Sequence, residues 1–331
     1  MKIVIPTAGY GTRMRPQTWS KPKPLIPVAG KAVLGHVLDM FETLPNIEEV
    51  IFIIGYLGDQ IEAYVNEAYP DLPTRSIIQE ELNGQSPAIW LAREYLSGPM
   101  MMAFVDTIIE ADLAALASEE AGAVAWVKEV PDPRRFGVAA VDDQGWVKHL
   151  VEKPQDISNN LAVVGFYYFQ QAENLIAAIE EQMEKKELLK GEYFLVDAIN
   201  IMLEDGLKMR VEPIEEWHDC GKPDALLETN RYLLENGRDN TEVASQLQGT
   251  VVVPPVFIDP SAEISESVIG PHVSIGAGCR IERSKIKDSI IDSGSHIVDA
   301  SVSASIIGRN TLVQGHFRDL NIGDSAIVRT E

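Results

Sequence analysis

Hydrophobic residues over about the first 235 positions of this 331-residue chain occur in short runs that alternate with stretches of helical periodicity. Residues 2–5 and 50–54 are apolar runs with the length of a buried strand, and apolar side chains recur between them, from Val33 to Phe41, on one helix face. The alternation continues with a helix over 61–68, a strand over 75–78, a helix over 88–95 and a strand over 100–105. This order predicts an α/β fold with a Rossmann-like, mostly parallel sheet and helices on both faces.

A second pattern begins near residue 250, where single aliphatic residues recur every five or six positions with Gly, Ser and Ala between them. The recurring residues are Ile258, Ile264, Ile269, Ile275, Ile281, Ile286, Ile291, Ile297, Val302, Ile307 and Val313. Hexapeptide spacing of this kind predicts a left-handed parallel β-helix with roughly four coils. The alternative is a β-sandwich, which would show polar and apolar alternation over longer strands joined by hairpins.

The change of pattern divides the chain into three predicted parts. Residues 1–236 form the α/β domain, residues 237–250 are polar and form a linker, and residues 251–331 form the β-helix.

Composition narrows the functional classes. The formal charge of −22, with no run rich in Lys or Arg, argues against nucleic acid as a partner. The chain has two cysteines, so a disulfide framework is not expected, and no segment has the length and apolarity of a membrane span. We therefore expect a cytoplasmic protein.

A loop that combines glycines with cations follows the first predicted strand. It contains Gly9-Tyr10-Gly11-Thr12-Arg13 and then Pro22-Lys23-Pro24. Glycines allow backbone N–H groups to approach phosphate oxygens, and Arg and Lys neutralise phosphate charge. The loop lacks the Gly-Lys-Ser/Thr ending of a P-loop and the third glycine of a dinucleotide-binding loop. It is predicted to bind a polyphosphate at the carboxyl ends of the strands, beside the loops after Ile78 and Val105.

These segments resemble the signature of the sugar nucleotidyltransferases, the pyrophosphorylases that make nucleoside diphosphate sugars. The resemblance extends over most of the first 235 residues and implies that residues 1–236 are a catalytic domain. It implies nucleotidyl transfer from a nucleoside triphosphate to a sugar 1-phosphate, with release of pyrophosphate. It also implies Mg²⁺ as cofactor, held by Asp106 after a central strand and by Asp219 in Trp217-His218-Asp219-Cys220-Gly221.

The resemblance assigns the remaining site residues by motif, with Arg13 and Lys23 as the catalytic cations. The implied nucleotide-binding residues are Ala8, Gly9, Gly11, Thr12, Arg13, Lys23, Gln79 and Gly84. The implied sugar-phosphate-binding residues are Gly137, Glu152, Lys153, Val163 and Lys190.

Two of these assignments have plainer alternatives. Asp106 could instead cap a helix running from Thr107 to Leu113, because Asp is common at helix N-caps. The adjacent pair Glu152 and Lys153 could be a solvated strand edge.

The identity of the substrates is less constrained. The spacing of Gln79 and Gly84 resembles uridylyl and thymidylyl members, which favours UTP or dTTP, and family frequency favours glucose 1-phosphate. Tyr10 and Arg15 resemble guanylyl members, so a mannose-1-phosphate guanylyltransferase stays open. A bifunctional uridylyl/acetyltransferase also stays open, since His272, His296 and His316 lie in the repeats, as does a non-catalytic regulatory subunit that binds sugar nucleotide. The β-helix favours a homo-oligomer.

Overall fold

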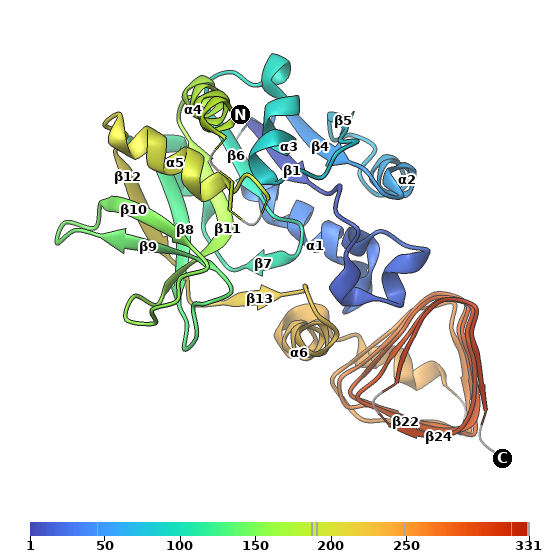
Figure 1. The fold of residues 1–331 in the computed structure, drawn as a ribbon. Helices are drawn as coiled ribbons and strands as arrows, with labels where there is room; N and C mark the ends of the chain where they lie inside the picture. The colour runs from blue at the N-terminus through green and yellow to red at the C-terminus, as the bar shows by residue number, and fades with distance from the viewer. Residues whose placement is uncertain (45, 187, 190, 248, 319, 330–331) are drawn as a thin grey trace. The chain divides into compact units, whose positions relative to one another are not determined.

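The chain packs as two compact units in the computed structural model, which describes residues 1–44, 46–186, 188–189, 191–247, 249–318 and 320–329 (Figure 1). The first unit contains Met1–Gly9 and Val37–Trp217, and the second contains Tyr10–His36 and His218–Glu331. The glycine-rich loop from Tyr10 onwards therefore packs with the C-terminal repeats. The three-part division predicted from sequence stays a prediction.

A parallel sheet forms the centre of the first unit. Its strands are β1 (Lys2–Pro6), β4 (Glu49–Ile54), β5 (Thr74–Ile78) and β6 (Met100–Ala103), in the spatial order β6-β1-β4-β5. Parallel pairing joins β1 to β4, β1 to β6 and β4 to β5. The runs at 2–5 and 50–54 become strands because almost every side chain in them is buried, as parallel strands require. The predicted mostly parallel α/β core is confirmed.

Antiparallel strands extend this sheet beyond β6. They are β8 (Ala123–Glu129), β9 (Gly137–Val141), β10 (Val147–Glu152) and β11 (Leu161–Phe169), with β12 (Met209–Pro213) parallel to β8. Strand β11 pairs antiparallel with β6, β8 and β9. Its pairing with β8 shifts register between Val163 and Tyr167, which is a β-bulge that contains Gly165. The short strands β7 (Thr107–Ile109) and β13 (Trp217–Asp219) follow β6 and β12 along the chain.

Helices are present where the apolar spacing predicts them, near 33–41, 61–68 and 88–95. They are α1 (Val33–Met40), α2 (Gly58–Ala68) and α3 (Gln85–Leu91). Two further helices, α4 (Ala172–Lys185) and α5 (Leu195–Glu204), were not predicted. Helix α3 is shorter than predicted, because the chain turns into a 3₁₀ helix over Arg93–Tyr95. Helices α3, α4 and α5 pack on one another, and α5 packs on β10 (Figure 1).

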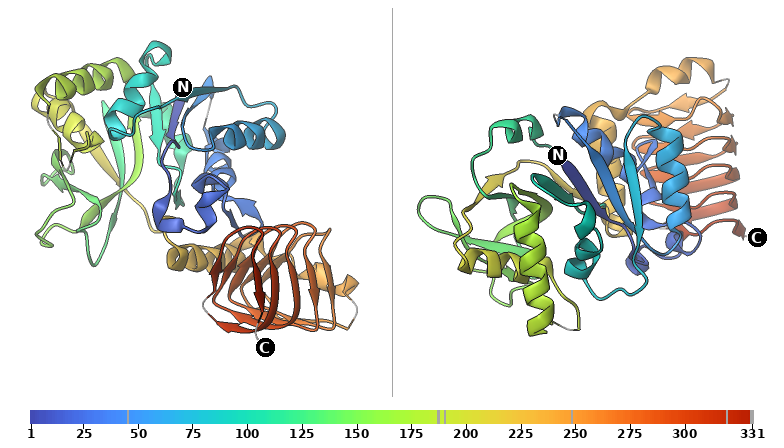
Figure 2. Two further views of the ribbon diagram at one scale, coloured as in Figure 1. Left: turned by 45° about the vertical axis from the view of Figure 1, so that its right-hand side comes forward. Right: turned by 90° about the horizontal axis from the view of Figure 1, so that it is seen from above.

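Stacked triangular coils form most of the second unit (Figure 2). The strands are β14 (Val251–Val252), β15 (Val256–Ile258), β16 (Glu263–Ser265), β17 (Val268–Ile269), β18 (Val273–Ile275), β19 (Arg280–Glu282), β20 (Lys285–Lys287), β21 (Ser289–Ile291), β22 (His296–Ser303), β23 (Ile306–Ile307), β24 (Leu312–Arg318), β25 (Asn321–Ile322) and β26 (Ile327–Arg329). Pairing is parallel between coils: Val256 faces Val273, and Val273 faces Ser289. The recurring aliphatic residues are all buried in one core, so the parallel β-helix is confirmed and the β-sandwich is excluded.

Shorter elements complete the second unit. The strands β2 (Pro27–Val28) and β3 (Lys31–Ala32) form a hairpin, and α6 (Pro223–Leu233) packs against β2, β18 and β21. A π-helical turn over Leu234–Arg238 and a 3₁₀ helix over Thr241–Gln246 lead into the coils. None of the helices within the described ranges combines the length and apolar character of a membrane-crossing segment.

Candidate active site

The carboxyl ends of β1, β5 and β6 lie along one edge of the sheet, as predicted, because these strands are parallel. Thr7 directly follows β1. Its N–H and its hydroxyl both donate hydrogen bonds to the Ile53 carbonyl, at 2.8 and 2.9 Å. This anchor fixes the direction in which the chain leaves the sheet at Ala8. A side chain at Gly55 would lie 2.9 Å from the Ala8 Cβ, so Gly55 makes room for this exit.

Gln79 starts the loop after β5, and its N–H donates to the Ile54 carbonyl at 2.8 Å. Only 7% of the Gln79 surface is exposed. Gly84 ends the loop with φ 121°, and a Cβ there would lie 2.4 Å from the Tyr193 carbonyl oxygen. That carbonyl accepts hydrogen bonds from the N–H groups of Gln85 and Ser86, at 2.9 and 3.2 Å. A close backbone approach therefore requires glycine at 84, whatever ligand the loop binds.

Asp106 follows β6 in a segment that β11 holds in place. The Phe104 N–H donates to the Gly165 carbonyl at 3.0 Å, and a Cβ at Gly165 would lie 2.5 Å from the Phe104 ring. The bulge at Gly165 thus seats Phe104, two residues before Asp106. The helix-cap alternative for Asp106 is wrong, because Thr107–Ile109 is a strand.

Three predicted sugar-phosphate residues come together on β9, β10 and β11. A Cβ at Gly137 would lie 3.3 Å from Glu152 Oε2 and 3.8 Å from Val163 Cγ2. Glu152 lines a pocket of about 460 Å³ together with residues of β10, α5 and the segment before α5. The lining residues are Leu150, Val151, Glu152, Leu188, Leu189 and Asp197.

The strand-edge alternative fits only in part, because Glu152 ends the edge strand β10 and the Lys153 side chain is 37% exposed, whereas the Glu152 side chain is shielded. The Glu152 side chain is only 11% exposed, and its Oε1 lies 3.0 Å from Lys153 Nζ. The Lys153 ammonium also lies 4.2 Å from the centre of the Phe194 ring. Behind this pair, burial raises the pKa of Tyr167, and the charge of Glu152 raises it further. Lys190, the fifth predicted residue of this group, lies outside the described residues.

The glycine-rich loop of the second unit brings Gly11 and Lys23 together. Gly11 has φ 59°, and a Cβ there would lie 2.9 Å from Lys23 Cβ and 3.0 Å from Thr18 Cγ2. The Thr18 hydroxyl closes the loop by donating to the Gly11 carbonyl at 2.9 Å. Arg13 is exposed within the 3₁₀ helix Thr12–Met14, and Lys23 begins the 3₁₀ helix Lys23–Leu25. The loop therefore folds into a compact cationic element.

Asp219 lies at the end of β13, where Oδ1 accepts a hydrogen bond from the Gly221 N–H at 2.6 Å. The helix α6 begins just beyond, and the Thr229 hydroxyl of α6 lies 3.5 Å from the Asp219 carbonyl oxygen. Asp219 is partly exposed, and the hydrogen bond from the Gly221 N–H orients its carboxylate.

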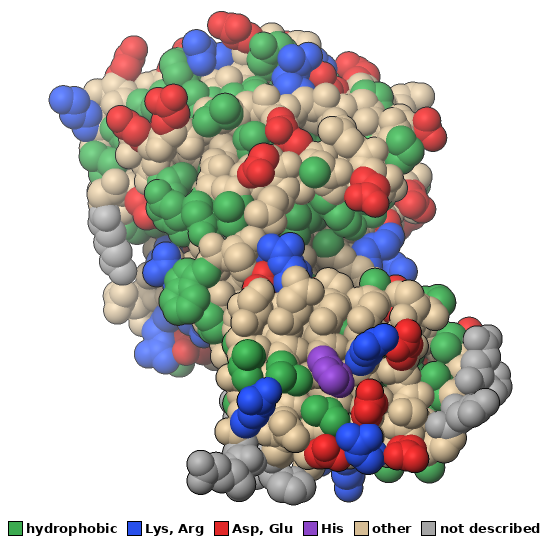
Figure 3. Space-filling model, turned by 90° about the vertical axis from the view of Figure 1, so that its right-hand side faces the viewer, with side chains coloured by type: hydrophobic (Ala, Val, Ile, Leu, Met, Phe, Trp, Pro, Cys, Tyr) green, Lys and Arg blue, Asp and Glu red, His purple; other side chains and the backbone are tan. Residues whose placement is uncertain are grey.

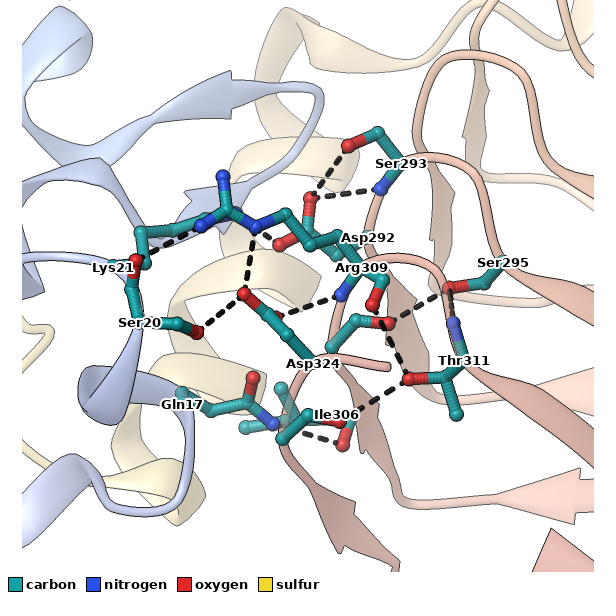
Figure 4. Close-up of polar contacts among 12 residues, drawn as sticks. Gln17, Ser20, Lys21, Asp292, Ser293, Ser295, Ile306, Arg309, Thr311 and Asp324 are labelled. Carbon is teal, nitrogen blue, oxygen red and sulfur yellow. Dashed lines mark hydrogen bonds and ion pairs between the residues drawn. The ribbon is translucent and has the colours of Figure 1, made fainter. Parts of the chain in front are cut away.

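The structure adds polar residues of the second unit that the sequence did not single out. Gln17, Lys21 and Asn230 are 4%, 9% and 1% exposed, and each bonds to the β-helix. Figure 4 shows Gln17 and Lys21 at this contact. A buried polar side chain is an unusual feature that requires partners. Their partners lie far away in the sequence, so no local pattern could identify these residues.

The three histidines of the repeats differ in their surroundings. His272 lies between two carboxylates, with Nε2 at 2.8 Å from Glu235 and Nδ1 at 3.0 Å from Asp288. His296 Nε2 lies 3.8 Å from Glu282. The His316 side chain lies outside the described part of the chain.

Comparison with known proteins matches two segments of the chain to family models. A nucleotidyl transferase family model matches residues 2–236, and a model described as the GMPPB C-terminal domain matches residues 252–328. A glucose-1-phosphate thymidylyltransferase of Streptomyces griseus is 29% identical over 354 residues, covering 98% of each chain. The bifunctional protein GlmU of Methanocaldococcus jannaschii is 33% identical over 254 residues, covering 76% of this chain and 59% of that protein. The chain thus spans less than two thirds of this last relative.

Solved structures share the fold. A crystal structure of UDP-glucose pyrophosphorylase complexed with UDP-glucose superposes with a TM-score of 0.63 at 20% identity, covering 71% of this chain and 98% of that one. With the family model matched over residues 2–236, the resemblance noted from the sequence motifs is confirmed. The chain belongs to the sugar-phosphate nucleotidyltransferase family.

Proposed function

We propose that this protein transfers a nucleotidyl group from dTTP or UTP to glucose 1-phosphate and releases pyrophosphate. The observation that carries the proposal is the largely shielded Glu152 side chain in its pocket, next to the Lys153 ammonium. A carboxylate accepts hydrogen bonds from sugar hydroxyls, while an ammonium neutralises a phosphate. The glucose-1-phosphate thymidylyltransferase that is similar to this chain over 98% of its length supports dTTP and glucose 1-phosphate.

The nucleotide binds, in this proposal, to the loops after β1 and β5. Gly9 has no atom within 4 Å of the position of an added Cβ in the described structure, so space for a phosphate exists beside the backbone there. Gln79 supplies a side-chain amide that both donates and accepts hydrogen bonds, which suits the edge of a uracil or thymine base. Its low exposure of 7% favours one orientation of the amide.

Arg13 and Lys23 act on the triphosphate. A phosphate oxygen of the sugar phosphate attacks the α-phosphorus in line, the bond to the β-phosphate oxygen breaks, and pyrophosphate leaves with that electron pair. The attacking phosphate already carries negative charge, so a side-chain nucleophile is not required. The cations stabilise the charge that develops on phosphorus and on the leaving group.

The carboxylates of Asp106 and Asp219 are the proposed ligands of Mg²⁺. Both side chains are partly exposed, and hard carboxylate oxygens are the donors that Mg²⁺ prefers. Within the described residues the Gly221 N–H donates to Asp219 Oδ1, and the carboxylate has further lone pairs that could bind a metal. When bound, the ion supplies charge neutralisation at the substrate phosphates.

Guanylyl transfer to mannose 1-phosphate is the second candidate, because Tyr10 and Arg15 resemble guanylyl members. We further propose that the protein acts in the cytoplasm as a homo-oligomer associated through its β-helix.

A pyrophosphate-release screen tests the proposal. Five nucleoside triphosphates are combined with glucose, mannose, galactose and amino-sugar 1-phosphates in the presence of Mg²⁺. The proposal expects the highest kcat/KM with dTTP or UTP and glucose 1-phosphate. Highest kcat/KM with GTP and mannose 1-phosphate would replace it by the second candidate, and no turnover with any pair would favour a non-catalytic binding protein.

A further inference from the structure

We propose that the β-helix holds the cationic loop in its substrate-binding geometry, with Asp292 and Asp324 as positioning residues. The inference rests on the proposed function, which assigns Arg13 and Lys23 to the triphosphate. The loop and the β-helix belong to the same compact unit, so their contacts are internal to it.

The first contact is a buried ion pair. Lys21, two residues before Lys23, places its ammonium on Asp292 Oδ2, and the two residues are only 9% and 8% exposed. Asp292 follows β21, and its other oxygen accepts hydrogen bonds from the Ser293 N–H at 2.8 Å and the Ser293 hydroxyl at 3.4 Å (Figure 4). The carboxylate is therefore oriented toward the loop. Removing one member of a buried pair leaves an uncompensated charge. Loss of Asp292 should therefore displace Lys21 and the loop that carries it.

The second contact links Ser20, the residue before Lys21, to Arg309 and Asp324 of the following coils. The Ser20 hydroxyl donates to Asp324 Oδ2 at 2.5 Å, and Arg309 Nη2 donates to the Ser20 carbonyl at 2.8 Å. Arg309 in turn donates through Nε to Asp324 at 2.6 Å, so the three residues form a closed network (Figure 4). Charge-assisted hydrogen bonds of this kind are stronger than neutral ones.

The third contact fixes the start of the loop. Gln17 Nε2 donates to the carbonyls of Ile322 at 2.6 Å and Ile306 at 3.2 Å, which belong to successive coils. Asn321 Nδ2 donates to the Arg15 carbonyl at 3.3 Å, two residues after Arg13. Backbone carbonyls of paired strands are rigid acceptors. The loop is therefore hydrogen-bonded directly to the strands of the β-helix.

The chain beyond Lys23 is held as well. The Ala29 N–H donates to Asn230 Oδ1 at 2.9 Å, and Asn230 Nδ2 donates to the His272 carbonyl at 3.2 Å. Gly30 lies against Phe257 of β15, and an added Cβ would meet that ring at 2.4 Å. The loop is thus attached to the β-helix on both sides of Lys23.

In this proposal the attachment lets the β-helix set the position of the catalytic cations. Pro22 and Pro24 stiffen the chain on either side of Lys23, so a shift at Lys21 is passed along the backbone. A misplacement of about 1 Å in a reacting group costs ~10²-fold in rate. Asp292 and Asp324 would act on turnover through Lys21 and Ser20, without touching substrate.

The test compares Asp292→Ala with the double variant Lys21→Met/Asp292→Leu and with the control Asp299→Asn. Asp299 pairs with Arg283 at an exposed position of the same β-helix. Each variant is measured for kcat and KM, for melting temperature, and for amide hydrogen exchange in residues 10–25. We expect Asp292→Ala to lose ~10-fold or more in kcat with little change in sugar-phosphate KM, and to exchange faster in residues 10–25. The double variant should recover part of both losses, because it buries no unpaired charge, and Asp299→Asn should match the wild type.

Wild-type kcat and wild-type exchange in Asp292→Ala would overturn the inference. If that single variant fails to fold, the double variant decides: a kcat reduced with an unchanged melting temperature supports positioning, and an unchanged kcat overturns it. If the wild type releases no pyrophosphate with any substrate pair, the proposed function fails. In that case amide hydrogen exchange alone tests the attachment of the loop to the β-helix. Unchanged exchange in residues 10–25 of both variants would contradict this attachment.

Discussion

The backbone of Gly11 lies against the stem of Lys23, and an added Cβ at residue 11 would approach Lys23 Cβ to 2.9 Å. Two ends of one loop are therefore packed so closely that the lysine depends on the glycine for its position. The contact exists because Gly11 adopts φ 59°, a conformation that only glycine accepts without strain.

Replacing Gly11 by alanine should displace Lys23 and lower turnover. The Cβ collides with the lysine stem and the positive φ adds strain of about 1 kcal/mol. We expect kcat to fall ~10-fold or more, measured by pyrophosphate release. The matched control is Gly145→Ala, with φ 84° but no atom within 4 Å of the added Cβ, which should cost stability but not kcat. Equal kcat losses in both variants would contradict the expectation.

Removing either loop cation should reduce turnover much more than binding. A cation aimed at developing charge contributes a few kcal/mol to the transition state, so Arg13→Ala or Lys23→Ala should lose ~10²-fold or more in kcat. Steady-state kinetics with Lys287→Ala, an exposed lysine of β20, provides the control. Near-wild-type kcat in the Lys23 variant would remove Lys23 from the catalytic group.

Neutralising Asp106 or Asp219 should change the metal response. Asp106→Asn and Asp219→Asn should raise the Mg²⁺ concentration that gives half-maximal rate by ~10-fold or more, since each variant loses a charged ligand. A titration of pyrophosphate release with Mg²⁺ measures this, with the exposed Asp143→Asn as control. An Asp106→Asn titration curve that coincides with the wild type would move the ligand elsewhere.

Replacing Glu152 by glutamine should weaken binding of the sugar phosphate. Hydrogen bonds to a charged group contribute about 1.5–3 kcal/mol, so kcat/KM for the sugar phosphate should fall ~10-fold or more. The KM for the nucleoside triphosphate should stay within about twofold. Glu129→Gln, at the exposed end of β8, serves as the control. A loss confined to the nucleotide KM would assign Glu152 to the other substrate.

Cys279 should resist thiol reagents in the folded protein. Burial raises the pKa of its thiol from 9.0 to about 11, and its Sγ donates to the Asp292 carbonyl at 3.2 Å. At pH 8 the thiol is therefore protonated as well as inaccessible, and a chromogenic disulfide reagent should modify it only after unfolding. The Cys220→Ser variant isolates this thiol. As pH rises from 9.0 toward 11, the unfolded thiol ionises first, so its contribution to stability declines.

Strands and coils were predictable from sequence because burial imposes a period on the residues that form them. The runs at 2–5 and 50–54, and the repeat from Ile258 to Val313, all lie where the pattern places them. The strand Thr107–Ile109, which is too short to show a period, and the antiparallel strands β8 to β11 were not predicted.

The attachment of the cationic loop could not be predicted. Lys21 resembles a loop lysine like Lys23, and nothing near it identifies Asp292 as its partner, 271 residues further along the chain. A long-range ion pair leaves no periodic trace in a single sequence. The roles of Arg13, Lys23, Glu152 and Asp106 came from motif resemblance and stay predictions until the variants are measured.

The separation of Lys21 and Asp292 along the sequence also determines when their ion pair can form during synthesis. At about 5–20 residues per second, a ribosome needs roughly 15–55 seconds to add the 271 residues that separate them. The cationic loop is translated before the coils, so Lys21 lacks its Asp292 partner until that coil is made. The ion pair that attaches the cationic loop to the β-helix can therefore form only after the coil that carries Asp292 has been synthesised.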